Sequence, residues 1–179
     1  MKSVYILLIS LMVFAGCRSK AGLNQQKGPF KGSSYKSNKV FFRASANAES
    51  MNLDSARILA LSLANEQLVL LVRTEINDIY KKYITGSIGV NNTYGQRFKN
   101  VTLQGMNQTL FTGLKQIAER VYETQRKTYQ VWVVQELRKR EFYRKLIQHI
   151  LDNSEFNENE KKELKDLIDK TIADLNDKY

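Results

Sequence analysis

The sequence predicts an α+β fold in which one strand and a β-hairpin form a small antiparallel sheet with a long helix, followed by two C-terminal helices. Three observations predict it: a β-branched and aromatic run at residues 39–46, apolar residues at helical spacing from residue 53, and a second β-rich run at residues 129–137. The 179 residues, 42% of them hydrophobic, fit one globular domain.

The composition provides few groups for chemistry. One cysteine and one histidine exclude an intrachain disulfide, a His-rich metal cluster and a relay of several histidines. No grouping of nucleophile, base and metal ligands is visible in the sequence. We therefore expect no enzymatic activity, no cofactor, no metal and no small-molecule substrate.

Residues 1–16 have the form of an export signal. One lysine precedes a mostly apolar run at residues 4–15, which is shorter than the roughly 20 apolar residues of a membrane-spanning helix. The run ends in Ala15-Gly16 directly before Cys17, the only cysteine. This arrangement resembles the bacterial lipobox, which implies cleavage between Gly16 and Cys17 and lipidation of Cys17. The alternative is an incidental thiol behind an ordinary signal.

Residues 17–38 have the composition of a lipid anchor followed by a flexible, basic linker. They are rich in Ser, Gly, Lys and Gln, and they contain the only proline, Pro29. The positive charges either attract anionic lipid headgroups or belong to a spacer that is simply solvated. Arg18 stands where an Asp would resemble an inner-membrane retention signal, which favours the periplasmic face of the outer membrane. Nucleic acid is not an expected partner, because an exported protein does not meet it.

Residues 39–46 predict a strand, and a turn follows it. Asn52 can cap a long helix whose apolar positions recur at intervals of three and four residues: Leu53, Ala56, Ala60, Leu63, Ala64, Leu71, Ile76, Ile79 and Tyr83. Alanines in this row would let the helix approach the sheet closely. Residues 86–105 are rich in Gly, Asn and Thr, and they predict an irregular excursion or a short helix.

Residues 114–123 and 129–137 predict a hairpin. The first arm also fits helical spacing, and we favour a strand because the second arm needs a partner. Residues 138–179 form a helical extension with two apolar rows, Phe142, Leu146, Ile147, Ile150 and Leu151 in the first and Leu164, Leu167, Ile168, Thr171, Ile172 and Leu175 in the second. Asn157 and Glu160 have the spacing of a capping box. These apolar rows must be buried against another surface, which is either the sheet, the other C-terminal helix or a second copy of the chain.

The string Phe41-Phe42-Arg43-Ala44-Ser45-Ala46, then Ser50-Met51-Asn52-Leu53 and the alanines at 56, 60 and 64, resembles the start of the Lpp-twenty family of bacterial lipoproteins. Residues 129–137 are similar to that family's closing strand, so the resemblance covers residues 39–137. It implies a sandwich of strand, helix and hairpin, a lipid anchor in the outer membrane, and a part in envelope or flagellar assembly. The family carries over no catalytic residues.

Several side chains are candidates for a site, each with a structural alternative. His149 is a candidate base or a packed helix residue, and Glu75 and Asp78 are helix carboxylates that make a poor acid/base pair. Trp132 either fills the core or sheet face or stacks on a ligand. Ser55, in the string Asp54-Ser55-Ala56, resembles a bacterial O-glycosylation site.

Three tyrosines lie near two lysines in the sequence. Stacking on the tyrosine rings together with the lysine charges could bind a glycan or an anionic polymer. The alternative is that these side chains pack in the core and at its rim. These residues are Tyr80, Lys81, Lys82, Tyr83 and Tyr94. The charge is also unevenly distributed, with an excess of basic residues at 115–145 and of acidic residues at 152–179. These two regions are either solvated faces or patches of opposite charge that permit self-association.

The leading hypothesis is a lipid-anchored, non-catalytic module that docks envelope proteins or itself at the outer membrane. An edge strand, or the apolar face of residues 142–151, would supply the contact. The alternative is a binder of anionic envelope polymer, such as lipopolysaccharide or peptidoglycan, and a hydrolase comes third.

Overall fold

The α+β class is confirmed. The computed structural model describes residues 28–86, 92–105 and 112–175. Its elements are η1 Ser33–Tyr35, β1 Phe41–Ser50, α2 Leu53–Gly86, α3 Asn92–Gly105, β2 Lys115–Glu123, β3 Tyr129–Arg138, α4 Lys139–Asp152 and α5 Glu158–Asp174. The three strands form one antiparallel sheet in the order β1-β3-β2, so β1 and β2 are its edges.

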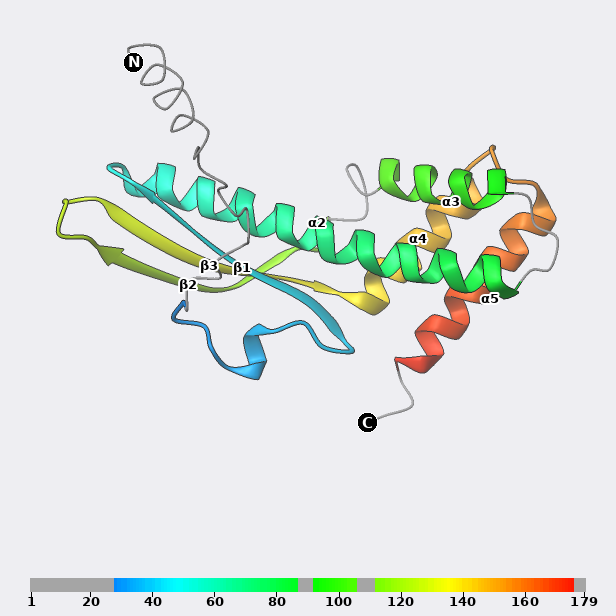
Figure 1. Cartoon of the computed structure of the whole chain (residues 1–179), viewed down its shortest axis with the longest axis horizontal. Coiled ribbons are helices and arrows are strands. Elements are labelled where there is room, and N and C mark those ends of the chain that lie inside the picture. Colours follow the sequence, from blue (N-terminus) through cyan, green and yellow to red (C-terminus); the bar gives the residue numbers. More distant parts are fainter. Residues whose placement is uncertain (1–27, 87–91, 106–111, 176–179) are drawn as a thin grey trace, which may run out of the picture.

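Helix α2 connects the two ends of the molecule. Its first half lies along one face of the sheet, and its second half extends past the sheet to meet α3, α4 and α5 (Figure 1). The core follows this division. Small residues of α2 and the sheet, such as Ala60 and Ala46, pack at one end. Large residues of the helices, such as Leu68 and Phe142, pack at the other.

The predicted strand continues beyond its expected end. Residues 47–49, where a turn was expected, are the last part of β1, and Asn47 pairs with Trp132 of β3. The turn falls instead at Met51 and Asn52. The expected cap is present, because the Asn52 side-chain oxygen accepts a hydrogen bond from the Ser55 amide at 2.9 Å.

The predicted hairpin is confirmed, with β2 antiparallel to β3 and a register shift at Ile117. The segment after α2 that was expected to be irregular or a short helix contains the helix α3, in which Phe98 and Val101 are buried.

The buried row of α2 differs from the predicted row. Every fourth residue faces inward, at Ala56, Ala60, Ala64, Leu68, Val72 and Ile76. Leu63 and Leu71, which were predicted to be in the row, are exposed. The reason is that apolar residues surround the helix, so spacing alone could not identify the inner face. The alanines lie inside because the sheet residues opposite them are small, and the two backbones approach closely.

The two C-terminal helices form as predicted, and the capping box is present. The Asn157 side chain accepts from the Glu160 amide at 3.0 Å, while the Glu160 side chain accepts from the Asn157 amide at 2.7 Å. Glu160 is also buried and accepts from Arg97 Nη2 of α3 at 3.0 Å. The apolar rows are covered within the chain, since Leu146 and Leu164 share one core with α2 and α3.

The described part of the predicted flexible linker is packed. Residues 28–38, which include η1, lie on the face of the sheet opposite α2 (Figure 1). Gly28 lies directly against the ring of Trp132, which is 7% exposed, so the core or sheet-face alternative for this tryptophan is confirmed. Further along, Ser37 Oγ accepts from the Arg43 amide at 2.8 Å and donates to the Arg43 carbonyl at 2.9 Å.

Gly28→Ala is expected to lift this segment from the sheet. A Cβ at Gly28 would lie 2.2 Å from Cζ3 of Trp132, and the buried ring has no room to move. Because Trp132 is the only tryptophan, its fluorescence emission should shift to longer wavelength. Gly32→Ala is the matched control, since a Cβ there meets nothing closer than 3.6 Å and φ is −71°. Identical spectra for both variants would contradict the packing.

Candidate functional site

The proposed lipidation site lies outside the described residues, and this applies to both Gly16 and Cys17. Ser55, the possible glycosylation site, is exposed in the first turn of α2. Its side chain therefore faces solvent, although its amide is held by the helix cap.

His149 serves the packing of α4 against α3. Its Nε2 lies 3.0 Å from the carbonyl oxygen of Val101, and its ring lies against the backbone of Gly105. A Cβ at Gly105 would come within 2.6 Å of Nε2, so the close contact uses the absence of a side chain there. This is the packed alternative for His149.

Glu75 joins α2 to α4. Its carboxylate accepts from Lys139 Nζ at 3.1 Å and from the Tyr143 hydroxyl at 2.7 Å. Burial, then the charge of Glu75 and the hydrogen bond to it, raise the pKa of Tyr143 far above its ordinary value. The Asp78 carboxylate oxygen Oδ1 lies 3.8 Å from Lys81 Nζ. Asp78 and Glu75 both line a surface depression of about 410 Å³. Glu75 is thus committed to structural partners, and it does not pair with Asp78.

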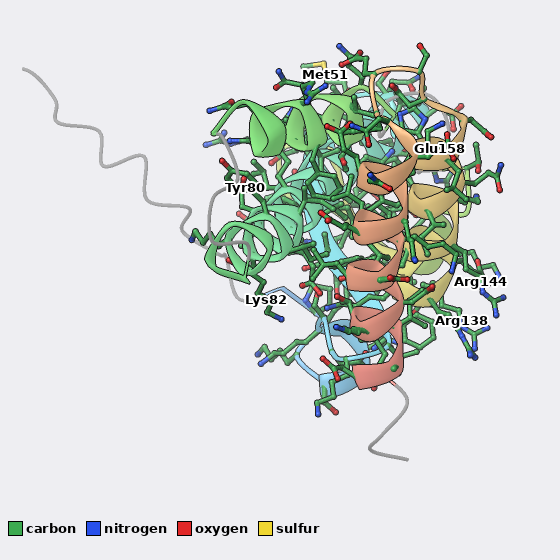
Figure 2. All side chains as sticks on the ribbon, turned by 90° about the vertical axis from the view of Figure 1, so that its right-hand side faces the viewer. Met51, Tyr80, Lys82, Arg138, Arg144 and Glu158 are labelled. Carbon is green, nitrogen blue, oxygen red and sulfur yellow. The ribbon has the colours of Figure 1, made fainter. Side chains whose placement is uncertain are left out.

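The tyrosine and lysine candidates are brought together only in part. Tyr80 packs against Gly95 of α3, where a Cβ would come within 1.6 Å of the ring (Figure 2). Lys82 lines the depression beside Glu75. The side chains of Tyr83 and Tyr94 lie outside the described residues. Tyr80 therefore has the core and rim role.

Within the described part of the chain, no three His, Cys, Asp or Glu residues are grouped closely enough to hold a metal ion. One helix, residues 53–82 of α2, is long and apolar enough to cross a membrane by length and composition, with 28% of its most apolar window buried. This helix packs along its alanine row on the sheet.

The outer side of α2 carries the most conspicuous surface feature. Five large aliphatic side chains are exposed along it, and we call them the α2 outer row: Ile58, Leu59, Leu63, Leu70 and Leu71. The exposed fractions reach 66% at Ile58 and 55% at Leu70. Single exposed aliphatic residues are normal on a protein surface, but a continuous patch of them marks an interaction site.

One flank of α2 is held over the far strand. Arg57 Nε donates to Glu119 of β2 at 2.9 Å. Partial burial raises the pKa of Glu119, but hydrogen bonds from Arg57 and Gln116 and the charge of Arg57 lower it overall. Residues directly before and after a buried helical position lie about 100° to either side of it. Leu59 and Leu63 therefore lie on the flank away from β2, above the free side of β1.

The predicted docking face at residues 142–151 is wrong. Phe142, Leu146 and Ile150 are at most 1% exposed, because this row forms the core between α4 and the other helices. The surface around the start of α4 carries exposed arginines, one of which, Arg138 at the end of β3, pairs with the exposed Glu141. Arg138 and Arg144 project on the same side of the molecule, away from α2 (Figure 2), and Arg140 is also exposed.

Sequence reasoning missed the α2 outer row. A signal was present, because residues 53–72 place large aliphatic residues between alanines that recur every four residues. If the alanines face the sheet, the larger side chains must face outward. No family model, no curated protein and no solved structure matches this chain. The resemblance to the Lpp-twenty family therefore stays a prediction.

Tyr143→Phe is expected to lower the free energy of unfolding at neutral pH by about 1–3 kcal/mol, because a buried hydrogen bond to a charged group is lost. The raised pKa of Tyr143 also makes the stability of the fold depend on pH. Above about pH 10 Tyr143 ionises in the unfolded chain but not in the folded one, so its contribution to stability is present below that pH and lost above it.

Urea unfolding at pH 8 and pH 10.5 measures both effects. The wild-type protein should lose more stability across this interval than the Tyr143→Phe variant. Tyr122→Phe, at an exposed tyrosine of β2, is the matched control and should change little. Equal pH dependence in the wild type and Tyr143→Phe would contradict the assignment.

Proposed function

We propose that the protein is a lipid-anchored, non-catalytic interaction module of the bacterial cell envelope, held at the outer membrane and facing the periplasm. Cys17 would carry the acyl chains, and the α2 outer row would contact an envelope protein or another copy. The proposal combines the lipobox-like string before Cys17 with the surface of the folded body.

The α2 outer row is the observation that carries this proposal. Burying the alanines of α2 removes little apolar area from water, while the larger side chains of the same helix stay exposed. The close approach of α2 to the sheet requires small residues on the inner face, so the larger aliphatic residues stay exposed in the monomer. A partner that covers the row recovers the apolar burial that the monomer lacks.

The chain between anchor and body is long enough for such contacts. Eleven residue steps separate Cys17 from Gly28, the first residue that the structure describes. At about 3.3–3.6 Å per step, this segment can reach up to about 40 Å. The folded body can therefore turn its α2 face along the membrane or toward the periplasm.

The exposed arginines at the end of β3 and in α4, Arg138, Arg140 and Arg144, favour a second candidate function, binding of an anionic envelope polymer. Exposed arginines attract phosphate or carboxylate groups, but at 0.1 M salt this attraction is largely screened beyond about 10 Å, and it weakens further as the salt concentration rises. An apolar contact through α2 does not weaken in this way, so ionic strength separates the two candidates.

Cys17→Ser tests the anchor. We expect the wild-type chain to sediment with outer membranes and to incorporate labelled palmitate, and the Cys17→Ser chain to be soluble in the periplasm. The physical reason is that two or three acyl chains make attachment effectively permanent. An unmodified Cys17 in the mass spectrum of membrane-derived protein would refute the anchor.

Photocrosslinking in the native envelope tests the contact surface. A photoreactive residue at Leu70 should capture a partner at low and at high salt, whereas one at the exposed Lys162 of α5 should not. If adducts form at Arg144 rather than at Leu70, and disappear as the salt concentration rises, the polymer-binding candidate replaces the first.

A further inference from the structure

The free edge of β1 is divided into a covered half and an open half. The backbone groups of Phe41 and Arg43 point away from β3 and are bonded by Asn38 and Ser37 of the same chain, at 2.8–2.9 Å. Backbone groups alternate in direction along a strand, so those of Ser45, Asn47 and Glu49 point the same way. Within the described residues, nothing bonds them on that side.

The open half of the edge lies beside the free flank of α2. Helix α2 covers β1 and β3, and Arg57 ties its other flank toward β2. Leu59 and Leu63 therefore overhang the open edge, on the face that carries Ala46 and Ala48. A strand added there would gain hydrogen bonds from β1 and apolar contact from α2.

The linker of the same chain is a poor occupant. Residues 18–27 contain only Ala21 and Leu23 as apolar residues among charged and polar ones. Such a segment has neither the β-branched residues nor the alternation of a strand. An occupant with matching chemistry is β1 itself, from a second copy.

Charge favours β1 over β2 as the self-pairing edge. A two-fold axis at Asn47 uses all three open positions, placing Asn47 opposite Asn47 and Ser45 opposite Glu49, with no like charges in contact. On β2, an axis at Glu119 or Arg120 places each opposite itself. An axis at Val121 places Glu119 opposite Glu123, and directly opposed like charges are destabilising.

We propose that two copies of this chain form a two-fold dimer through the open half of β1, giving a six-stranded sheet in the order β2-β3-β1-β1-β3-β2. The two α2 helices would then lie on one face and meet through Leu59 and Leu63. The inference goes beyond the proposed function, because it names one partner and one register and does not require the anchor.

The spacing of the helices is consistent with this arrangement. Strands lie about 4.8 Å apart, so a helix over β1 and β3 has its axis about 5 Å from the two-fold axis. The two α2 axes would be about 10 Å apart, at the upper end of the 8–10 Å range for packed helices. Leu59 lies between Ala56 and Ala60, which pack with Ala46, so it is close to the axis.

The interface is small. About a dozen residues per copy would be buried, from β1, Met51 and the first three turns of α2, against 20–30 in an interface of standard size. The exposed large apolar side chains that it would cover are Met51, Leu59 and Leu63. The dimer is therefore expected to be weak in dilute solution and favoured where both copies share one membrane surface.

Asn47→Cys tests the register. Cα atoms in a hydrogen-bonded antiparallel pair lie about 5.5 Å apart, within the 4.4–6.8 Å range of disulfides. Mild oxidation of the full-length variant in membranes should give a covalent dimer. In the Cys17→Ser background, where the introduced cysteine is the only thiol, the same dimer should form at high protein concentration. Val121→Cys at the other sheet edge is the matched control and should stay monomeric.

A second pair of variants tests the helix contact. Leu59→Glu places a charge beside the axis and should weaken crosslinking of Asn47→Cys at least about tenfold. Leu70→Glu is the control, since Leu70 is exposed to a similar extent, 55% against 50%, but lies about 16 Å further along α2. Unchanged Trp132 emission would confirm that both variants fold.

Three results would overturn the dimer: no crosslink through Asn47→Cys, equal crosslinking through Val121→Cys, or an adduct of Asn47→Cys with a different protein. Equal loss from Leu59→Glu and Leu70→Glu would also contradict it. Failure of the proposed function is distinguishable, because membrane release is read from the wild type and Cys17→Ser alone, while crosslinking in the Cys17→Ser background needs no membrane.

Discussion

The contact between the alanines of α2 and the small residues of the sheet determines the rest of the structure. Ala56, Ala60 and Ala64 are fully buried against Ala46 and the valines of β3. Side chains this small let the helix backbone approach the sheet closely. Once the alanines occupy the inner face, the larger aliphatic residues of the same turns have only the outer face left.

The second half of α2 is held by different forces, because it has left the sheet. Large residues such as Leu68 and Ile76 pack there with α3, α4 and α5. Two polar contacts join the helices, Glu75 with Tyr143 and Lys139, and Glu160 with Arg97. Removing one partner from a buried polar pair is destabilising, so these contacts limit how the helices can be arranged. One long helix thus links an alanine-rich end to an end with large side chains.

Local rules predicted most of the elements, and the failures came from tertiary choices. The caps at Asn52 and Asn157, the hairpin and the two C-terminal helices follow from short-range patterns, which hold wherever the segment packs. The faces of α2 and α4 do not, because an apolar residue such as Leu63 or Leu146 can face either way, and only the packed neighbours decide. Nothing in the sequence around Asn47 required a turn, since its pairing with β3 allows the strand to continue. The proposed anchor at Cys17 falls outside the described residues, so only the sequence pattern before Cys17 predicts it.

The two sheet edges are protected to different extents, and this difference singles out β1. Exposed strand edges can recruit other chains, and proteins usually block them with charges, bulges or covering segments. Edge β2 carries Glu119, Arg120 and Glu123 and a register shift at Ile117, which together oppose pairing. Edge β1 is blocked by Ser37 and Asn38 over its first residues only. Its last residues carry small or short polar side chains and one charge, Glu49, and the overhanging leucines of α2 add apolar area above them. An edge left open only where a helix overhangs it is arranged for pairing, because the same opening elsewhere would bring aggregation without any apolar gain.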